Sequence, residues 1–237
     1  MQNKIQFTKW ITLILLFILV VLNVPSFGQT LKAKGINYIP EIEVMFNEGI
    51  MYYRKGDFPK AQEFFSLLIK EYPPHQRITI SYIMSAKCAY KLGNYREAVS
   101  LTDKLIKNYP ESHYVSYARF VKGYSLYQLG KFSNSLICFL EVADQSEDKK
   151  LVEKAQNFAL EIIDNNITLS ELIKLKEKVT PGKISAAIIT IKMAVKYLNI
   201  GKRDQAISLL QNFIKLYPDN PYNCLLYTSP SPRDLST

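Results

Sequence analysis

The side chains that could support chemistry in this chain are few, and none of them forms a catalytic pattern. His75 and His113 lie in separate loops, each without a Cys or a pair of carboxylates at ligand spacing. The chain has no Gly-rich phosphate loop, no nucleophile-elbow serine and no HExxH pattern. Asp144, Glu147 and Asp148 share one turn, but a cation site needs more oxygens at fixed offsets. We therefore expect no enzyme, metal site or cofactor. We expect the two histidines on the surface and the acidic cluster in a solvated loop.

The composition limits the class of protein further. The 237 residues are 48% apolar and 22% charged, which provides material for a core and excludes a disordered polymer. Three Cys and two His cannot supply a disulfide-rich scaffold, and no Cys stands at ligand spacing from either His to form a zinc site. Cys88 and Cys138 could pair in an oxidising compartment, but they fall on helices predicted for different units. We interpret them as small buried side chains.

The first residues are typical of an export signal. Lys4 and Lys9 precede an apolar run over residues 10–24, and small residues follow. As a helix this run would span about 22 Å, which is shorter than a hydrocarbon core of about 30 Å. We expect residues 1–28 to be a cleaved signal peptide, in contact with a membrane only before cleavage, and residues 29–40 to be a linker. No Cys stands at the expected cleavage site to carry a lipid. The predicted location is the periplasm of a Gram-negative bacterium.

The last residues do not continue the pattern that precedes them. Residues 224–234 match an in-frame translation of a common sequencing-library adapter, and a natural Ser/Pro-rich tail is the alternative. We expect residues 223–237 to be non-native and the natural chain to continue beyond about Tyr222.

The net charge of +9 does not by itself indicate a nucleic-acid partner. Basic residues alternate with acidic ones along the predicted helices, as in the stretch that holds Arg96, Glu97, Asp103, Lys104 and Lys107. Such patterns are typical of solvated helix faces. Because an exported protein also meets little nucleic acid, we expect none as a partner.

A similar phrase recurs along the chain and indicates a repeat architecture. Leu-Ile-Lys-Glu-Tyr-Pro ends at Pro73, Leu-Ile-Lys-Asn-Tyr-Pro at Pro110 and Phe-Ile-Lys-Leu-Tyr-Pro at Pro218. Each unit is predicted to hold two helices, because apolar residues recur at helical spacing and Gly and Pro mark the helix ends. The predicted turn glycines are Gly56, Gly93, Gly130 and Gly201. Neither helix of a pair can bury its apolar stripe alone, so the pairs must stack into an all-α solenoid.

These residues resemble the tetratricopeptide repeat (TPR) family. The family's pattern is met in the first unit by Gly49, Tyr52, Gly56, Ala61, Phe65 and Pro73. The third unit departs from it, since Ser135 stands where Ala is expected. The Tyr-Pro endings are similar to the periplasmic branch of the family, which includes outer-membrane assembly and cell-division coordination factors.

The resemblance implies a right-handed α-solenoid of TPR-like helix pairs over residues 41–222. The expected units are about 41–74, 75–111, 112–148, a degenerate pair at 149–180, and 181–222. Small residues at Ala61, Ala98 and Ala206 are expected where the two helices of a unit approach closely.

The family's geometry places the first helix of each unit on the inner face of the solenoid. The positions that project from this face form a largely aromatic set of expected partner-binding residues: Phe46, Ile50, Tyr53, Ile83, Lys87, Tyr90, Tyr117, Phe120, Tyr124 and Tyr127. An apolar patch of this size is seldom left exposed without a function, and Tyr is favoured at interfaces. We expect a groove for an extended peptide or protein segment, and the alternative is internal core. Capture of a C-terminal carboxylate is not expected, because Lys87 is the only basic residue of the set.

We therefore predict an exported periplasmic TPR scaffold that binds a protein or peptide partner in cell-envelope assembly. The alternative is the N-terminal module of a larger periplasmic protein, similar to solute-binding proteins or activators of cell-wall synthases. An α/β pattern downstream would favour that alternative. The oligomeric state stays open.

Overall fold

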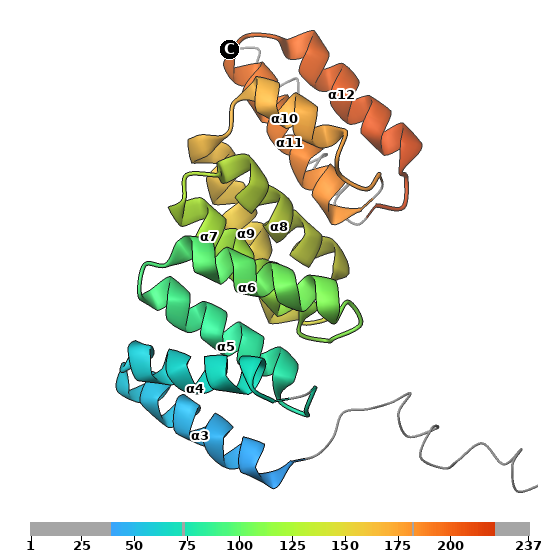
Figure 1. Ribbon diagram of the computed structural model, residues 1–237. Coiled ribbons are helices and arrows are strands. Elements are labelled where there is room, and N and C mark those ends of the chain that lie inside the picture. Colours follow the sequence, from blue (N-terminus) through green and yellow to red (C-terminus); the bar gives the residue numbers. More distant parts are fainter. Residues whose placement is uncertain (1–38, 73, 182, 221–237) are drawn as a thin grey trace, which may run out of the picture.

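The computed structural model describes residues 39–72, 74–181 and 183–220. Over these residues the chain forms ten helices and no strand, stacked one after another into an elongated column with α3 at one end and α12 at the other (Figure 1). The helices are α3 (Pro40–Lys55), α4 (Phe58–Lys70), α5 (Ile78–Lys91), α6 (Tyr95–Asn108), α7 (Val115–Gln128), α8 (Phe132–Gln145), α9 (Lys149–Asn166), α10 (Leu169–Lys176), α11 (Ile184–Asn199) and α12 (Arg203–Leu216). The predicted signal peptide at 1–28, the linker residues 29–38 and the predicted tail at 223–237 lie outside the described residues.

A tight glycine turn joins the helices of four pairs: α3–α4, α5–α6, α7–α8 and α11–α12. The turn residues Gly56, Gly93, Gly130 and Gly201 have φ angles of +81°, +80°, +69° and +75°. Only glycine adopts this left-handed conformation without steric cost. The predicted helix ends at these four positions are therefore confirmed.

Small residues let the two helices of a pair approach each other closely. A Cβ atom added at Gly49 of α3 would lie 2.8 Å from Phe65 Cε1 of α4, a separation that side chains do not tolerate. In the next pair the small positions are filled by alanine, where Ala98 of α6 is fully buried against Ala86 and Ala89 of α5. The helix crossing thus has no room for a larger side chain.

Ala98→Leu is expected to reduce the free energy of unfolding by about 1–3 kcal/mol, because the added atoms overpack the crossing of α5 and α6. The control is Ser100→Leu on the exposed face of the same helix, which should change it by less than about 0.5 kcal/mol. Urea unfolding followed by circular dichroism measures both. Equal stability of the two variants would contradict the helix register.

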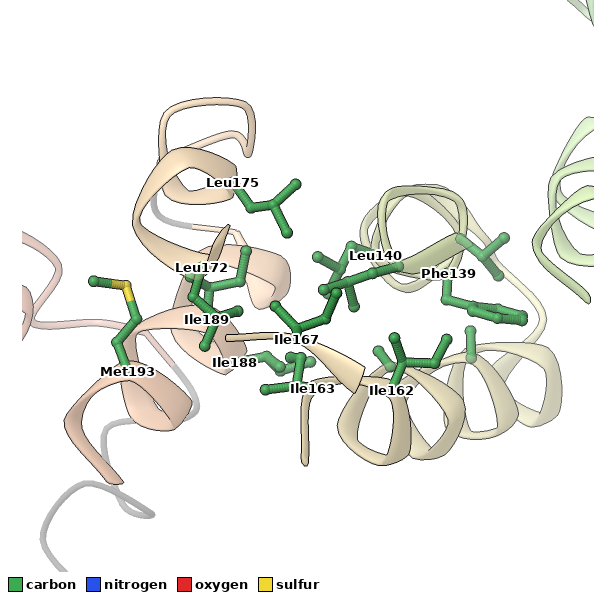
Figure 2. Packing of buried hydrophobic residues seen from close by; sticks show 14 of the residues in the cluster. Phe139, Leu140, Ile162, Ile163, Ile167, Leu172, Leu175, Ile188, Ile189 and Met193 are labelled. Atoms are coloured by element: carbon green, nitrogen blue, oxygen red, sulfur yellow. The ribbon is translucent and has the colours of Figure 1, made fainter. Parts of the chain in front are cut away.

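The segment after the third pair departs from the regular stacking. Helix α9 packs along α8, whereas α10 packs mainly on α11 and hardly contacts α9. One core cluster joins the four helices, and Figure 2 shows its side chains from α8, α9, α10 and α11 meeting around Ile167, which follows α9. A capping box at Thr168 and Glu171 begins α10. The assignment of residues 149–180 to a degenerate repeat stays a prediction.

Of the three acidic residues expected in a solvated loop, Asp148 is exposed in the loop before α9, as expected, whereas Asp144 lies in α8 and is half-buried, so the expectation is wrong for Asp144 alone. Asp144 accepts hydrogen bonds from the backbone N–H of Ser185 at 2.9 Å and from its hydroxyl at 2.5 Å, which fixes the start of α11 to the end of α8. Asp148 caps α9 by accepting from the backbone N–H groups of Lys150 and Leu151. Glu147 is exposed as expected.

His75 is fully buried, so its expected place on the surface is also wrong. The backbone N–H of Arg77 donates to His75 Nδ1 at 3.1 Å, so the ring proton is on Nε2, which donates to the carbonyl of Leu68 at 3.1 Å. The Arg77 guanidinium donates three hydrogen bonds to the carboxylate of Glu43, which joins this loop to α3. The neutral imidazole is therefore part of the junction between the first two pairs. His113 is exposed, as expected.

Acid should destabilise this junction. Burial lowers the pKa of His75 below its ordinary value of 6.5, so the unfolded chain binds the proton more readily than the folded one. The stabilising effect is therefore complete above about pH 6.5 and falls as the pH drops below it, with a slope of at most about 1.4 kcal/mol per pH unit.

Urea unfolding between pH 7.5 and 5.5 tests this dependence. His75→Asn keeps an acceptor for the Arg77 N–H and should flatten the pH dependence in this window, whereas His113→Asn should leave it unchanged. A wild-type stability that does not fall below pH 6.5 would contradict the assignment.

Candidate functional site

A cavity of about 270 Å³ opens on the first helices of the first three pairs, and we call it the aromatic groove. It is lined by Tyr53 of α3, by Ile83, Lys87, Tyr90 and Lys91 of α5, and by Tyr117, Phe120, Val121 and Tyr124 of α7. Seven of the ten predicted partner-binding residues therefore meet in one cavity. Sequence reasoning missed Lys91 and Val121, because they fall outside the projected inner-face positions.

The structure places the other three predicted residues outside the groove. Phe46 is only 5% exposed and packs against Phe65, with 5.6 Å between the ring centroids. Ile50 is half-buried against the core of the first pair. Tyr127 packs against Phe132 at 5.3 Å. Phe46 and Ile50 thus belong to the core of the first pair, and Tyr127 packs on the core cluster that joins α8 to α11.

The repeat period holds the groove's tyrosines in fixed positions. Tyr53 packs edge-on against Phe58 at 5.4 Å, and Tyr90 makes the equivalent contact with Tyr95 at 5.4 Å. Tyr90 also contacts the ring of Tyr124 in the next pair at 6.2 Å. Aromatic pairs with this edge-to-face geometry are favourable and restrict ring rotation. The groove is thus preformed by packing within and between pairs.

Helix α9 covers one end of the row of aromatic residues on the inner face. Phe158 of α9 lies 4.6 Å from the Tyr124 ring and stacks on Phe139 of α8 at 5.6 Å. Phe120 contacts the same cluster, 5.4 Å from Phe139. Burial raises the pKa of Tyr124 to about 12, so its hydroxyl stays neutral at physiological pH. The aromatic residues of α7 are therefore part of the core where α9 covers them. On the side that faces α3 they line the open groove.

The open part of the groove carries a positive charge on its floor. The ammonium of Lys87 lies 5.3 Å from the centre of the Tyr53 ring, within the range of a cation–π contact. Burial lowers the pKa of Lys87, with Lys91 acting in the same direction. Burial also raises the pKa of Tyr53. A cation, apolar side chains and neutral phenol groups thus face the same space.

Tyr117 joins the groove to a second, polar cavity of about 530 Å³ that is lined mainly by the loops before α7 and after α8. Tyr117 is 43% exposed, and its hydroxyl donates to a carboxylate oxygen of Asp148 at 3.2 Å. Burial, followed by this hydrogen bond, raises the pKa of Tyr117. The polar cavity also contains Glu111 and Arg119, and the side chain of Arg119 pairs with Glu141 at 3.1 Å.

The described residues show no group of three or more His, Cys, Asp or Glu side chains that could hold a metal ion. Cys88 and Cys138 are buried and unpaired, which confirms their interpretation as small buried side chains. Burial raises the pKa of each thiol to about 12, which disfavours the reactive thiolate. Within the part of the chain that the structure covers, none of the helices is sufficiently long and apolar to cross a bilayer.

Comparisons with known proteins agree with the helical-repeat architecture. A family model described as "YfiO: Outer membrane lipoprotein" matches residues 41–166, more than half of the chain, and a tetratricopeptide repeat model matches residues 192–220. The chain matches no curated protein sequence.

Three solved structures illustrate the similarity. MamA from Desulfovibrio magneticus RS-1 is 16% identical with a TM-score of 0.45, and the match covers 75% of this chain and 96% of that one. The TPR-like repeats of a kinesin light chain from Podosopora anserina are 14% identical with a TM-score of 0.41, covering 74% and 94%. YrrB, described as a TPR protein with an unusual peptide-binding site, is 16% identical with a TM-score of 0.44, covering 85% and 97%.

The stacked helix pairs and the two family matches define a TPR protein, a class of helical-repeat scaffolds. The predicted fold class, an all-α right-handed α-solenoid of TPR-like helix pairs, is confirmed. Within this class the chain belongs to the YfiO family, whose model is described as an outer membrane lipoprotein.

Proposed function

We propose that this protein is an exported scaffold of the bacterial cell envelope that binds an extended segment of a partner protein in the aromatic groove. The observation that carries the proposal is a preformed apolar cavity whose rings are fixed by their own packing. Binding to a rigid surface costs little side-chain ordering, and Tyr contributes large contact area with a polar end. A protein or peptide segment fits such a groove better than a small polar metabolite.

The location in the envelope is supported by two independent features. The first residues match a signal peptide that would be cleaved after residue 28, and the family model is described as an outer membrane lipoprotein. We place the mature protein in the periplasm of a Gram-negative bacterium, where it takes part in envelope assembly. Its role there is to hold a partner and not to catalyse a reaction.

Site-specific crosslinking tests the groove as the binding surface. A photoreactive benzoylphenylalanine at position 117, a rim residue, should crosslink one defined envelope protein in cells of the native host after irradiation. The same group at Lys104 on the exposed face of α6 should not. Tyr90→Ala removes one wall of the groove and should reduce the adduct several-fold, while circular dichroism shows that the helices persist. A lack of adduct at position 117, or an equal yield at position 104, would contradict the proposal.

A further inference from the structure

Lys87 is a half-buried cation that has no counterion among the residues that the structure describes. It is half-buried on the floor of the aromatic groove, and its ammonium faces the Tyr53 ring. Lys87 forms no ion pair with any carboxylate of the described residues. By contrast, the half-buried Lys122 pairs with Asp103 at 2.7 Å. The charge on Lys87 is therefore available to a ligand.

Because Lys87 is half-buried, its charged form is destabilised when no anionic group lies beside it. Burial, and to a lesser extent the nearby Lys91, lowers the pKa of Lys87, so these surroundings disfavour its charged form. A carboxylate placed beside the ammonium would favour the charged form again and add a charge-assisted hydrogen bond. Lys91, which is exposed at the edge of the groove, attracts the same kind of ligand.

The neighbours of Lys87 define what should flank that carboxylate. Ile83 precedes Lys87 by one helical turn, about 6 Å along α5. Phe120 and Val121 of α7 line the cavity beside it. In an extended segment, side chains two residues apart point the same way and are about 6.6 Å apart. An apolar side chain near Ile83 and a carboxylate near Lys87 therefore match residues separated by one position.

We propose that the aromatic groove binds an internal, extended protein segment in which an Asp or Glu side chain, separated by one residue from a large apolar residue, pairs with Lys87. The proposal rests on the proposed function, because it specifies the ligand of the same groove. The lining of the groove offers the ammonium groups of Lys87 and Lys91 but no Arg or Asn side chain that would add donors for a chain end, so we assign a side-chain carboxylate to it. The segment carries its charge in the middle and needs no free terminus.

Peptide selection against the full chain provides the probe. Random twelve-residue peptides displayed on phage are selected on the wild-type protein and counter-selected on Tyr90→Ala, so that groove binders are enriched. The best peptide is synthesised with a free and with an amidated C-terminus, and with its acidic residue changed to the amide. Fluorescence anisotropy gives the Kd of each on wild type, Lys87→Met, Lys87→Arg and the exposed control Lys104→Met.

The expected result is an enriched apolar-x-acidic or acidic-x-apolar pattern. The acid-to-amide change and Lys87→Met should each weaken binding about tenfold and should not add when combined, whereas Lys87→Arg and Lys104→Met should retain affinity. Amidation of the C-terminus should have no effect.

Two outcomes would overturn the inference and separate it from the proposed function. Groove binders that lack acidic residues, that tolerate Lys87→Met, or that lose affinity on C-terminal amidation would contradict the internal carboxylate and leave the groove as a binding surface. Failure to enrich any peptide that depends on Tyr90 would contradict both proposals.

Discussion

The structure depends on how closely the two helices of each pair approach. Gly49 and Gly123 hold equivalent positions in the first and third pairs, and a Cβ atom at either would lie within 3.0 Å of the ring of Phe65 or Phe139. This contact sets the distance between the helices and seats a large ring at their crossing. Ala86 holds the equivalent position in the second pair and packs with Ala98. Because a small residue recurs at this crossing in the first three pairs, their first helices lie in register and present equivalent residues to the same face.

The aromatic groove forms because the first helices of the first three pairs are aligned. It ends where this alignment ends, after the third pair. Tyr53 and Tyr90 hold equivalent positions and make the same edge-on contact with the first aromatic residue of their second helices. After the third pair, α10 leaves α9 and packs on α11, while Phe158 of α9 packs over the aromatic residues of α7. The open surface is therefore confined to the first three pairs, and the last pair is attached through Asp144 and the shared core.

Much of the fold could be predicted from the sequence because its determinants are local. Helical spacing of apolar residues and a left-handed glycine act within a few positions, so the helices and turns of the glycine-joined pairs were predictable. The groove was predictable in part, because equivalent positions in successive repeats lie on the same face of the solenoid. Phe46 and Tyr127 satisfy the same pattern, but Phe46 packs on Phe65 and Tyr127 packs on the core cluster that joins α8 to α11. Only this packing distinguishes them from Tyr53 and Tyr90, which line the groove.

Contacts that depend on the tertiary path of the chain were not predictable in this way. His75 carries no local signal of burial, since its partners depend on the backbone path between the first two pairs. The pairing of Asp144 with Ser185 joins residues 41 positions apart across the interrupted segment. The position of Phe158 was not predictable either, although its packing separates the buried aromatic residues from those that line the groove. Likewise, only the structure shows that no carboxylate of the described residues pairs with Lys87.

The central claim is that an extended partner segment occupies the aromatic groove. Ring-labelled tyrosine NMR of the full chain, titrated with the envelope segment that crosslinks at position 117, tests it most directly. The account predicts that signals of Tyr53, Tyr90, Tyr117 and Tyr124 shift together and saturate, while those of Tyr72 and Tyr217 do not move. Shifts confined to Tyr72 or Tyr217, or none in the groove at saturating segment, would contradict it.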